Sequence, residues 1–528
     1  MSRILLVHLH TGAFMNAAVI STTRRAPAVP LHQPNVVDLI VDRARCAPDA
    51  LALVTPNNGR DRVVRYGDLV GRAAAYAAWL DAAEIPAGAR VQLLVRPDAE
   101  VYALVLALLA RGMSLVVADG RAGTRRLLGT LADAAPDVVI AAPSVMCWWP
   151  LVSTLRRARR FTMGGSVPGA SHLADHVAQG TVLPLAPRDV PDDAPAVVSF
   201  SSGNTGRSKA VIRTHAVLLA QHRALTAAIP LDATDVNLPG FPLATLHNLC
   251  CGITTVLAPS DLRSMADAEP AAIATMIERC GVTSLSGSPS YIGNLARHLV
   301  RAGTPIHSVR RLVVGGGPVG RALCAEIRGA FPEADAHAIY GATEAEPIAI
   351  VSIDEVAAEG EREGFLVGRP VEGSEVCLRT GSESRATVGE VAVRGEHVAS
   401  RSAWHRTGDI GRFDGQGRLW LLGRVGTAVS YHGVTVHPYV VEADALSVAG
   451  VRAAAFVAHS RAPNGELVVQ LDPGADDGAL LRDLRAVLAD RGLPELSIHI
   501  TDAIPMDARH GSKVARPALL TMLERETR

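Results

Sequence analysis

Apolar and polar residues alternate along this chain with two different periods. Apolar residues recur at helical spacing in three early stretches, 36–45, 69–80 and 99–110. Short β-branched runs bounded by Gly, Pro or Asp indicate buried strands at 90–95, 115–118, 138–141, 197–200, 255–257 and 312–314. Strands that alternate with helices predict βαβ units, which build mostly parallel sheets with helices on both faces. The pattern therefore predicts an α/β fold.

The pattern changes character at three places farther along the chain. Residues 160–195 are rich in Gly and Pro and predict a loop, whereas 372–397 carry apolar runs between turns and predict a small β subdomain. After Gly423 the pattern restarts with a strand–turn–strand piece, a helix near 477–491 and a last strand at 496–500. This restart indicates a separate C-terminal unit.

The length of the chain requires more than one hydrophobic core. It has 528 residues, and single cores stop growing near about 250–300 residues. We expect an N-terminal extension over 1–34, poorly ordered in part, and a large domain of mostly parallel sheets with a small β subdomain over 35–423. A small, mobile α+β domain should follow over 424–528.

Charge and cysteine content restrict the classes of binding partner and the cellular compartment that the sequence favours. The chain has 52 basic and 52 acidic residues, so neither nucleic acid nor an anionic membrane is favoured as a partner. Seven cysteines without metal-ligand spacing predict free thiols in a reducing cytoplasm. No stretch reaches the roughly 20 apolar residues of a membrane span. His8 and His10 interrupt the first apolar run, so we expect no signal peptide, and Met15 is an alternative start.

A run of small hydroxyl and glycine residues, Ser199–Lys209, follows the apolar strand at 194–198 and ends in a lysine. Glycines let the backbone approach an anion, hydroxyls and amides donate hydrogen bonds to its oxygens, and the lysine supplies a charge. Only Asn204 and Thr205 separate two of its glycines, which differs from the spacing of nucleotide-hydrolase loops. The run predicts a phosphate-binding loop, with a flexible Ser/Gly loop as the alternative.

Three further clusters carry residues of related chemistry. Residues 339–344 combine an aromatic ring, a glycine turn, a hydroxyl and a carboxylate, which suit a purine, a phosphate oxygen and Mg²⁺. Residues 406–409 end in a carboxylate suited to two ribose hydroxyls, and an Asp-capped turn is the alternative. Residues 511–513 place a lysine in a glycine-containing loop, where an ordinary surface lysine is the simpler interpretation.

In this order, the clusters resemble those of the acyl-adenylate-forming superfamily, which includes acyl-CoA synthetases, adenylation domains of peptide synthetases and luciferases. The resemblance covers residues 35–520. It extends to Gly315-Gly316-Gly317-Pro318, which is similar to the family's adenine wall, and to 417–424, which is similar to the stretch leading into the interdomain hinge. A chance match of five motifs in the same order as in the family is improbable.

The resemblance implies a reaction that begins with Mg·ATP and a small-molecule carboxylic acid. The carboxylate attacks the α-phosphate, pyrophosphate leaves and an acyl-AMP remains bound, so positioning and charge neutralisation must supply most of the rate. Lys513 would bridge the carboxylate and the α-phosphate, Thr343 would contact that phosphate, and Glu344 would hold Mg²⁺. These three residues are the implied catalytic set.

The resemblance also implies a set of residues that bind ATP. In that set, glycine-rich loop residues hold the β- and γ-phosphates, Tyr340 stacks on adenine, and the ribose is bound by Asp409 and Arg424. The full set is Ser201, Ser202, Gly203, Thr205, Gly206, Lys209, Gly315, Gly316, Gly317, Tyr340, Gly341, Asp409 and Arg424. The loop departs from the family at Asn204, and the hinge pivot, usually Asp or Lys, is here Gly426.

The lysine loop separates two outcomes for the acyl group. It reads Asp-x-Arg-His-x-x-Lys over 507–513, a form that resembles the branch with the β-lactone synthetases of olefin biosynthesis and related acyl ligases. In those enzymes the β-hydroxyl of a 3-hydroxyacyl-AMP attacks its own carbonyl. Residues 433–438, with Glu442, instead resemble ligases that transfer the acyl group to CoA or to the phosphopantetheine of an acyl carrier protein. We favour the thioester route, with lactone closure as the alternative and a non-catalytic nucleotide-binding relative as a third interpretation.

The acid pocket implied by the resemblance is mainly small and apolar. Its expected lining includes Leu246, His247, Cys251, Ser286 and Ile348. This lining predicts an aliphatic acid, fatty or 3-hydroxy, because an amino acid's ammonium group would need an acidic partner. Asp235 lies just upstream and is interpreted as a surface turn residue. His247 is interpreted as a gate or base near the substrate carboxylate, or as a polar residue satisfied at the pocket rim.

Overall fold

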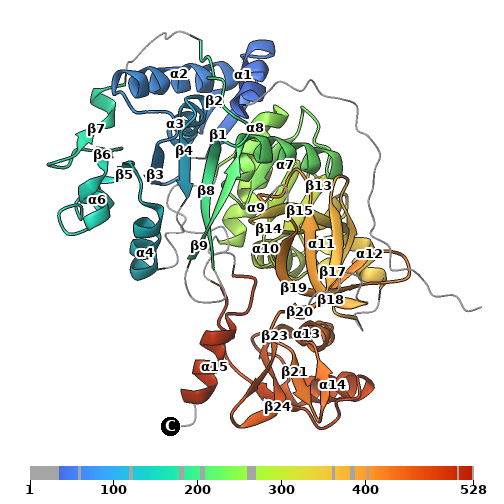
Figure 1. Cartoon of the computed structure of the whole chain (residues 1–528). Coiled ribbons are helices and arrows are strands. Elements are labelled where there is room, and N and C mark those ends of the chain that lie inside the picture. Colours follow the sequence, from blue (N-terminus) through green and yellow to red (C-terminus); the bar gives the residue numbers. More distant parts are fainter. Residues whose placement is uncertain are drawn as a thin grey trace, which may run out of the picture.

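The fold combines two large sheets with a smaller C-terminal layer (Figure 1). A computed structural model describes the chain over 35–56, 61–117, 123–177, 184–202, 208–257, 269–359, 363–380, 387–400, 403–507 and 511–525. Helices cover the sheets, and most strands of the two large sheets up to β14 run parallel. The predicted α/β class with parallel sheets flanked by helices is confirmed. The expected N-terminal extension lies outside the described residues.

The first sheet has seven strands in the order β7-β6-β5-β3-β4-β8-β9. Their bounds are β3 Arg90–Leu94, β4 Ser114–Val117, β5 Val138–Ala141, β6 Arg159–Thr162, β7 Ser171–His172, β8 Pro195–Ser202 and β9 Ser208–Thr214. Strand β9 is antiparallel to β8, and the other pairs are parallel. The prediction of a loop over 160–195 is wrong in part, because β6 and β7 extend this sheet. Phe161 and Thr162 are buried there, which the Gly and Pro content concealed.

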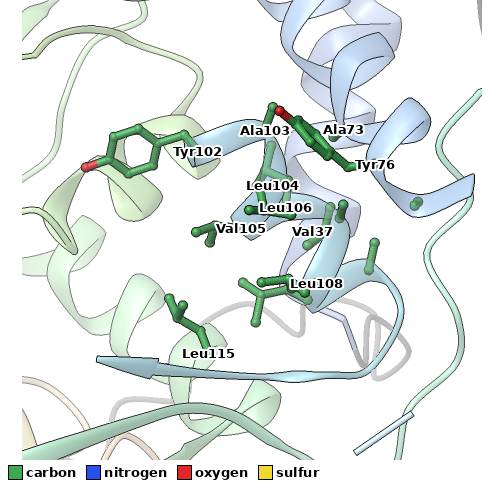
Figure 2. Close-up of a cluster of buried hydrophobic side chains, with 14 of the residues drawn as sticks. Val37, Ala73, Tyr76, Tyr102, Ala103, Leu104, Val105, Leu106, Leu108 and Leu115 are labelled. Atoms are coloured by element: carbon green, nitrogen blue, oxygen red, sulfur yellow. The ribbon is translucent and has the colours of Figure 1, made fainter. Parts of the chain in front are cut away.

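Helix α3 (Ala99–Ala110) forms the centre of the first hydrophobic core. Every residue of α3 except Glu100 is buried, as expected for a helix that is apolar on all sides. Figure 2 shows Leu104, Leu106 and Leu108 of this helix close to side chains of α1 (Val37–Cys46) and α2 (Tyr66–Ala82). Burying one such leucine contributes about 1.5–3 kcal/mol. This core fixes the position of β4 and β8, and therefore of the loop that follows β8.

The second sheet has thirteen strands in the order β17-β18-β19-β20-β16-β15-β14-β13-β12-β10-β11-β1-β2. Its first half contains β1 Leu51–Thr55, β2 Arg62–Arg65, β10 Val236–Pro239, β11 Thr254–Val256, β12 Ser284–Gly287, β13 Arg311–Gly315 and β14 Asp335–Ala342. The antiparallel half contains β15 Ala345–Ser352, β16 Phe365–Pro370, β17 Glu375–Arg379, β18 Val388–Arg394, β19 His405–Phe413 and β20 Leu419–Arg424. Thus the β stretch predicted over 372–397 forms the antiparallel end of this large sheet.

The helices between these strands follow the βαβ pattern. They are α4 Thr124–Ala134, α5 Pro143–Met146, α6 Ser153–Arg157, α7 His215–Ala228, α8 Ala244–Cys251, α9 Pro270–Arg279, α10 Pro289–Ala302, α11 Arg321–Ala330 and α12 Ile353–Ala358. Ser288 caps α10 by accepting a hydrogen bond from the N–H of Tyr291 at 3.3 Å. In parallel strands the carboxyl ends meet at one edge of the sheet, which is where ligands bind in open α/β folds.

The chain after Arg424 builds its own layers, seen at the bottom of Figure 1. They comprise β21 Val429–Tyr431, β22 Val434–Val436, β23 Val451–His459, β24 Ala462–Leu471, β25 Ser497–Ile500, α13 Pro438–Leu446, α14 Asp477–Asp490 and α15 Arg516–Arg525. The helix predicted near 477–491 and the strand predicted at 496–500 match α14 and β25. These layers enclose a separate apolar core around Phe456. The exact domain boundary between 423 and 424 stays a prediction.

Asp235 is buried, so its interpretation as a surface turn residue is wrong. Its carboxylate accepts hydrogen bonds from Arg310 at 3.2 Å, from Arg311 at 2.7 Å and from the Thr283 hydroxyl at 2.8 Å. The side chain has 0% exposure. Two arginines from the start of β13 therefore neutralise it and anchor β10.

Among the residues that the structure describes, no helix has the length and apolar content needed to cross a membrane.

Candidate active site

A cavity of about 2660 Å³ lies between the carboxyl edge of the second sheet and the C-terminal layers. Ser286, Gly315 and Gly341, at the ends of β12, β13 and β14, line it from the sheet side. Lys209 and Lys513 line it as well, although they lie far apart in the sequence. The structure thus brings together motifs that the sequence could only list in order.

The ribose pair predicted at Asp409 and Arg424 is joined in the structure. The two residues lie opposite each other on β19 and β20, and Arg424 Nη1 donates to Asp409 Oδ1 at 2.7 Å. The hydroxyl of Tyr340 donates to Asp409 Oδ2 at 2.8 Å. Arg424 lines the cavity, whereas Asp409 is 8% exposed and does not line it, so the contact of Asp409 with ribose hydroxyls stays a prediction.

Tyr340 is 8% exposed and belongs to the apolar cluster between β14, β15 and β18. Burial, together with the charge of Asp409, raises the pKa of its hydroxyl well above the ordinary value, so the group stays a proton donor. Its neighbours Ile339 and Gly341 line the cavity. Stacking of Tyr340 on adenine therefore stays a prediction, whereas the structure shows its hydrogen bond to Asp409.

Glu344 and Lys209 both act electrostatically on His405, the first residue of β19. Burial lowers the pKa of His405 below its ordinary value, the Glu344 carboxylate opposes that shift, and the Lys209 ammonium adds to it. Glu344 and Thr343 follow β14 directly and line the cavity. The lysine expected at the β- and γ-phosphates and the carboxylate expected at the metal therefore line the same cavity and act on the same histidine with opposite effect.

Of the glycine-rich loop, the structure describes both flanks. Ser201 and Ser202 end β8 and pair with Lys209 and Ser208 of β9. The predicted phosphate ligands Gly203, Thr205 and Gly206 lie outside the described residues. The β8–β9 pairing places Lys209 at the same end of the sheet as the loop that precedes it.

The loop that carries Lys513 is held by Asp507. The Asp507 carboxylate accepts hydrogen bonds from the N–H groups of Ser512 at 3.0 Å and Lys513 at 2.8 Å. Its own N–H donates to the carbonyl of Lys513 at 2.7 Å, and the Gly511 N–H donates to the carbonyl of Asp507 at 3.0 Å. Asp507 thus fixes the backbone of the loop and leaves the Lys513 side chain exposed toward the cavity.

This loop docks on the start of α10 and on Gly317. The N–H of Ser290 donates to Oγ of Ser512 at 3.1 Å. A Cβ placed on Gly317 would lie 2.6 Å from Cβ of Ser512, closer than real atoms approach. Gly315 and Gly316 line the cavity, whereas Gly317 makes room for the lysine loop. We call this contact of Ser290, Gly317 and Ser512 the lid contact.

The residues predicted for the acid pocket lie partly on the cavity wall and partly behind it, and their contact with an acid stays a prediction. Leu246, His247 and Ser286 line the cavity. Ile348 does not, because β15 places it at 0% exposure inside the apolar cluster of Tyr340 and Val391. Cys251 lies behind His247, with Sγ 3.5 Å from its Nε2. The sequence predicted Ile348 and Cys251 on the cavity wall because it does not show which way β15 and α8 orient their side chains.

One cavity residue was not predicted, and one sequence feature would have strengthened the predictions that were made. His222 of α7 lies 3.0 Å from His247 and also lines the cavity. The apolar spacing around His222 is that of an ordinary helix, so nothing in the sequence indicated that this residue lies at the cavity. Lys209 and Lys513, by contrast, are the only two lysines among the 528 residues. A chain that uses arginine everywhere else keeps the compact ammonium charge only at these two sites.

Comparisons with known proteins agree with this arrangement. Residues 40–401 match the family of AMP-binding enzymes. An olefin β-lactone synthetase of Stenotrophomonas maltophilia (strain K279a) is 32% identical, over 92% of this chain and 97% of that protein. The 4-coumarate–CoA ligase 5 of Oryza sativa subsp. japonica is 25% identical, over 90% and 93%. The structure of the amide bond synthetase McbA from Marinactinospora thermotolerans superposes with a TM-score of 0.76 at 25% identity, covering 92% and 99%. This chain belongs to the family of AMP-binding enzymes and is an adenylate-forming ligase.

Proposed function

We propose that this enzyme activates an aliphatic 3-hydroxy acid as its acyl-AMP and then closes the acyl group to a β-lactone. The observation that carries the proposal is the similarity to an olefin β-lactone synthetase, which spans 92% of this chain. The form of the lysine loop, built on Asp507, supports it. The proposal reverses the order of the two routes expected from the sequence.

In the first step, the protein neutralises charge and aligns the reacting atoms. Lys513 places its ammonium between the substrate carboxylate and the α-phosphate, while Lys209 stabilises the departing pyrophosphate. The bond between the α-phosphorus and the bridging oxygen breaks as the carboxylate oxygen bonds to phosphorus. Asp409, held by Tyr340 and Arg424, fixes the ribose.

The residues at the end of β14 fit a bound Mg²⁺ ion. Glu344 and Thr343 present a carboxylate and a hydroxyl to the cavity, and Mg²⁺ prefers oxygen ligands of this kind beside substrate phosphates. When bound, the ion would offset negative charge on the phosphate oxygens. Glu344 would hold it at the edge of the sheet.

In the second step, the oxygen of the 3-hydroxyl bonds to the acyl carbon, and the bond from that carbon to the AMP oxygen breaks. AMP leaves with the electron pair, and the hydroxyl proton passes to a base. Both reacting groups belong to one bound molecule, so no second substrate has to enter. The lid contact can therefore stay closed between the two steps.

Transfer to a thiol of CoA or of a carrier protein is the second candidate. The similarity to 4-coumarate–CoA ligase 5, over 90% of this chain, favours it. Glu442, which suggested this route in the sequence, is buried and accepts hydrogen bonds from Arg516 and from the N–H of Phe456. It stabilises the C-terminal layers and gives no support to thiol transfer.

The two routes differ in product. We would incubate the enzyme with ATP, Mg²⁺ and a chain-length series of fatty and 3-hydroxy acids, with and without CoA, and identify the products by mass spectrometry. Lactone closure predicts AMP, pyrophosphate and a product lighter than the hydroxy acid by one water, without CoA. A thioester that appears only with CoA, and no lactone, would refute the proposal.

A further inference from the structure

Two histidines and a cysteine form a hydrogen-bonded row beside the apolar arm of the cavity. His222 lies on α7, and His247 and Cys251 lie one turn apart on α8. The arm is lined by apolar side chains that include Leu218, Leu225, Leu243 and Leu246, and by both histidines. No step described above uses this row.

His247 contacts its two neighbours through opposite ring nitrogens. Its Nδ1 lies 3.0 Å from Nδ1 of His222, and its Nε2 lies 3.5 Å from Sγ of Cys251. The three residues could also offer atoms to a metal ion, because those atoms lie within 4.8 Å of one another. One ion would use only one nitrogen of His247, however, and here both are engaged by the protein. The geometry therefore favours hydrogen bonds.

The row is uncharged near neutral pH. Burial lowers the pKa of His222 to about 4, and the charges of Arg223 and Arg43 add to this shift. Burial lowers the pKa of His247 to about 3, with a smaller contribution from His222. Burial raises the pKa of the Cys251 thiol to about 11, although a hydrogen bond with the Thr226 side chain and the charge of Arg43 oppose the change. The row can therefore bind a neutral polar group without attracting an ion.

The row has two self-consistent arrangements of its protons. If the Cys251 thiol donates to Nε2 of His247, then Nδ1 of His247 donates to His222, whose own proton lies on Nε2. If Nε2 of His247 donates to the sulfur, every bond reverses and Nε2 of His222 becomes an acceptor. Within the described part of the chain, no group is bonded to that Nε2 atom. It is the open end of the row.

We propose that His222, supported by His247 and Cys251, binds a hydroxyl group on the acyl chain of the acid. A hydroxyl both donates and accepts, so it matches either arrangement of the row. A keto oxygen would match only one, and an ammonium or a second carboxylate would lie unpaired beside neutral rings. The inference deepens the proposed function and rests on it, since the hydroxyl bound here is the one that must close the lactone.

The test compares matched acids rather than total activity. Pyrophosphate release is measured with a series of 3-hydroxy acids and the unsubstituted acids of equal length, for the wild type and for His222→Phe, which keeps an aromatic ring but loses both nitrogens. We expect the wild type to favour the hydroxy acid in kcat/KM by about 10- to 100-fold, because an unmet polar group in the pocket is costly. In His222→Phe this ratio should fall to within about threefold, with kcat/KM for the unsubstituted acid little changed.

Two further variants exclude a purely structural effect. His222→Gln can still donate and accept, so it should keep part of the preference. His307→Phe changes an exposed histidine, 64% accessible and 3.8 Å from Glu333, and should keep all of it. Equal kcat/KM for both acids in the wild type, or a preference that survives in His222→Phe, would overturn this inference alone. Failure of every acid to release pyrophosphate from the wild type would overturn the proposed function, and this inference with it.

Discussion

At the scale of single residues, Lys513 carries the most specific expectation. Its backbone is fixed by Asp507 and its side chain faces the cavity. Lys513→Ala should lower the rate of pyrophosphate release by about 100- to 1,000-fold, because a charge aimed at the transition state is lost. ATP should still bind, because the predicted phosphate and ribose ligands remain.

Because the chain has only two lysines, ATP binding by the Lys513→Ala variant is easy to measure. In Lys513→Ala, Lys209 is the last lysine of the chain. Protection of Lys209 from an amine-specific reagent by ATP, followed by mass spectrometry, would report nucleotide binding directly. Normal pyrophosphate release from the variant would contradict the role of Lys513, and loss of ATP protection would show that it also holds the nucleotide.

At the scale of elements, the lid contact joins the start of α10 to the loop before α15. A methyl group on Gly317 would collide with Ser512, and overpacking of this kind costs about 1–3 kcal/mol. Gly317→Ala should therefore disfavour the closed lid and slow pyrophosphate release by about 10-fold or more. Adding Ser512→Gly should restore part of the rate, because the colliding side chain is gone.

A matched control exists on α2. A methyl group on Gly71 would meet nothing within 4 Å, so Gly71→Ala should leave the rate unchanged. If Gly317→Ala is as active as Gly71→Ala, the lid contact does not limit adenylation. Circular dichroism of both variants would separate loss of fold from loss of lid closure.

At the scale of the whole molecule, the question is whether the C-terminal layers must move between the two steps. An ideal Cβ on Gly511 would lie 4.0 Å from Cβ of Ser290, within the range of about 3.5–4.5 Å that suits a disulfide. The double variant Ser290→Cys/Gly511→Cys could therefore be oxidised to lock the lid in the closed position.

Locked with both ATP and the acid already bound, and then started with Mg²⁺, this enzyme should complete one round of lactone formation per molecule. Further rounds should need a reductant, because product release requires opening. Each single-cysteine variant, oxidised in the same way, controls for disulfides with the exposed Cys46 and Cys147. Acyl-AMP that accumulates and yields lactone only after reduction would show that the lid must move first.

The hinge predicted beside Arg424 is the element on which such movement would depend. Gly426 has φ +79°, and a Cβ there would meet nothing within 4 Å. The N–H of Val425, next to it, donates to the carbonyl of Gly408 at 2.9 Å. The large sheet therefore holds the chain up to Val425, and the glycine permits wide changes in dihedral angles immediately afterward.

Local pattern was enough to predict most of the large elements. Helix α3 and strand β5 match their predicted ranges, because burial on all sides requires an uninterrupted apolar run. Strands β6 and β7 were not predicted, since they are only four and two residues long and are fixed by pairing with β5 and with each other, which a local pattern does not show. Asp235 was misplaced for a related reason: its partners Arg310 and Arg311 are remote in sequence.

By itself, the sequence determined the α/β class and indicated which residues have the chemistry to bind a nucleotide, because these depend on residue type and on spacing within short segments. Only the tertiary structure decided which of those ligands meet. It joined Tyr340 to Asp409, placed Lys209 and Lys513 on the wall of one cavity, seated Ser512 against Gly317, and turned Ile348 away from the cavity. It also placed His222 beside His247, a contact between two helices that no local pattern encodes. Contacts of this kind depend on how sheets and helices pack, which is a property of the whole chain.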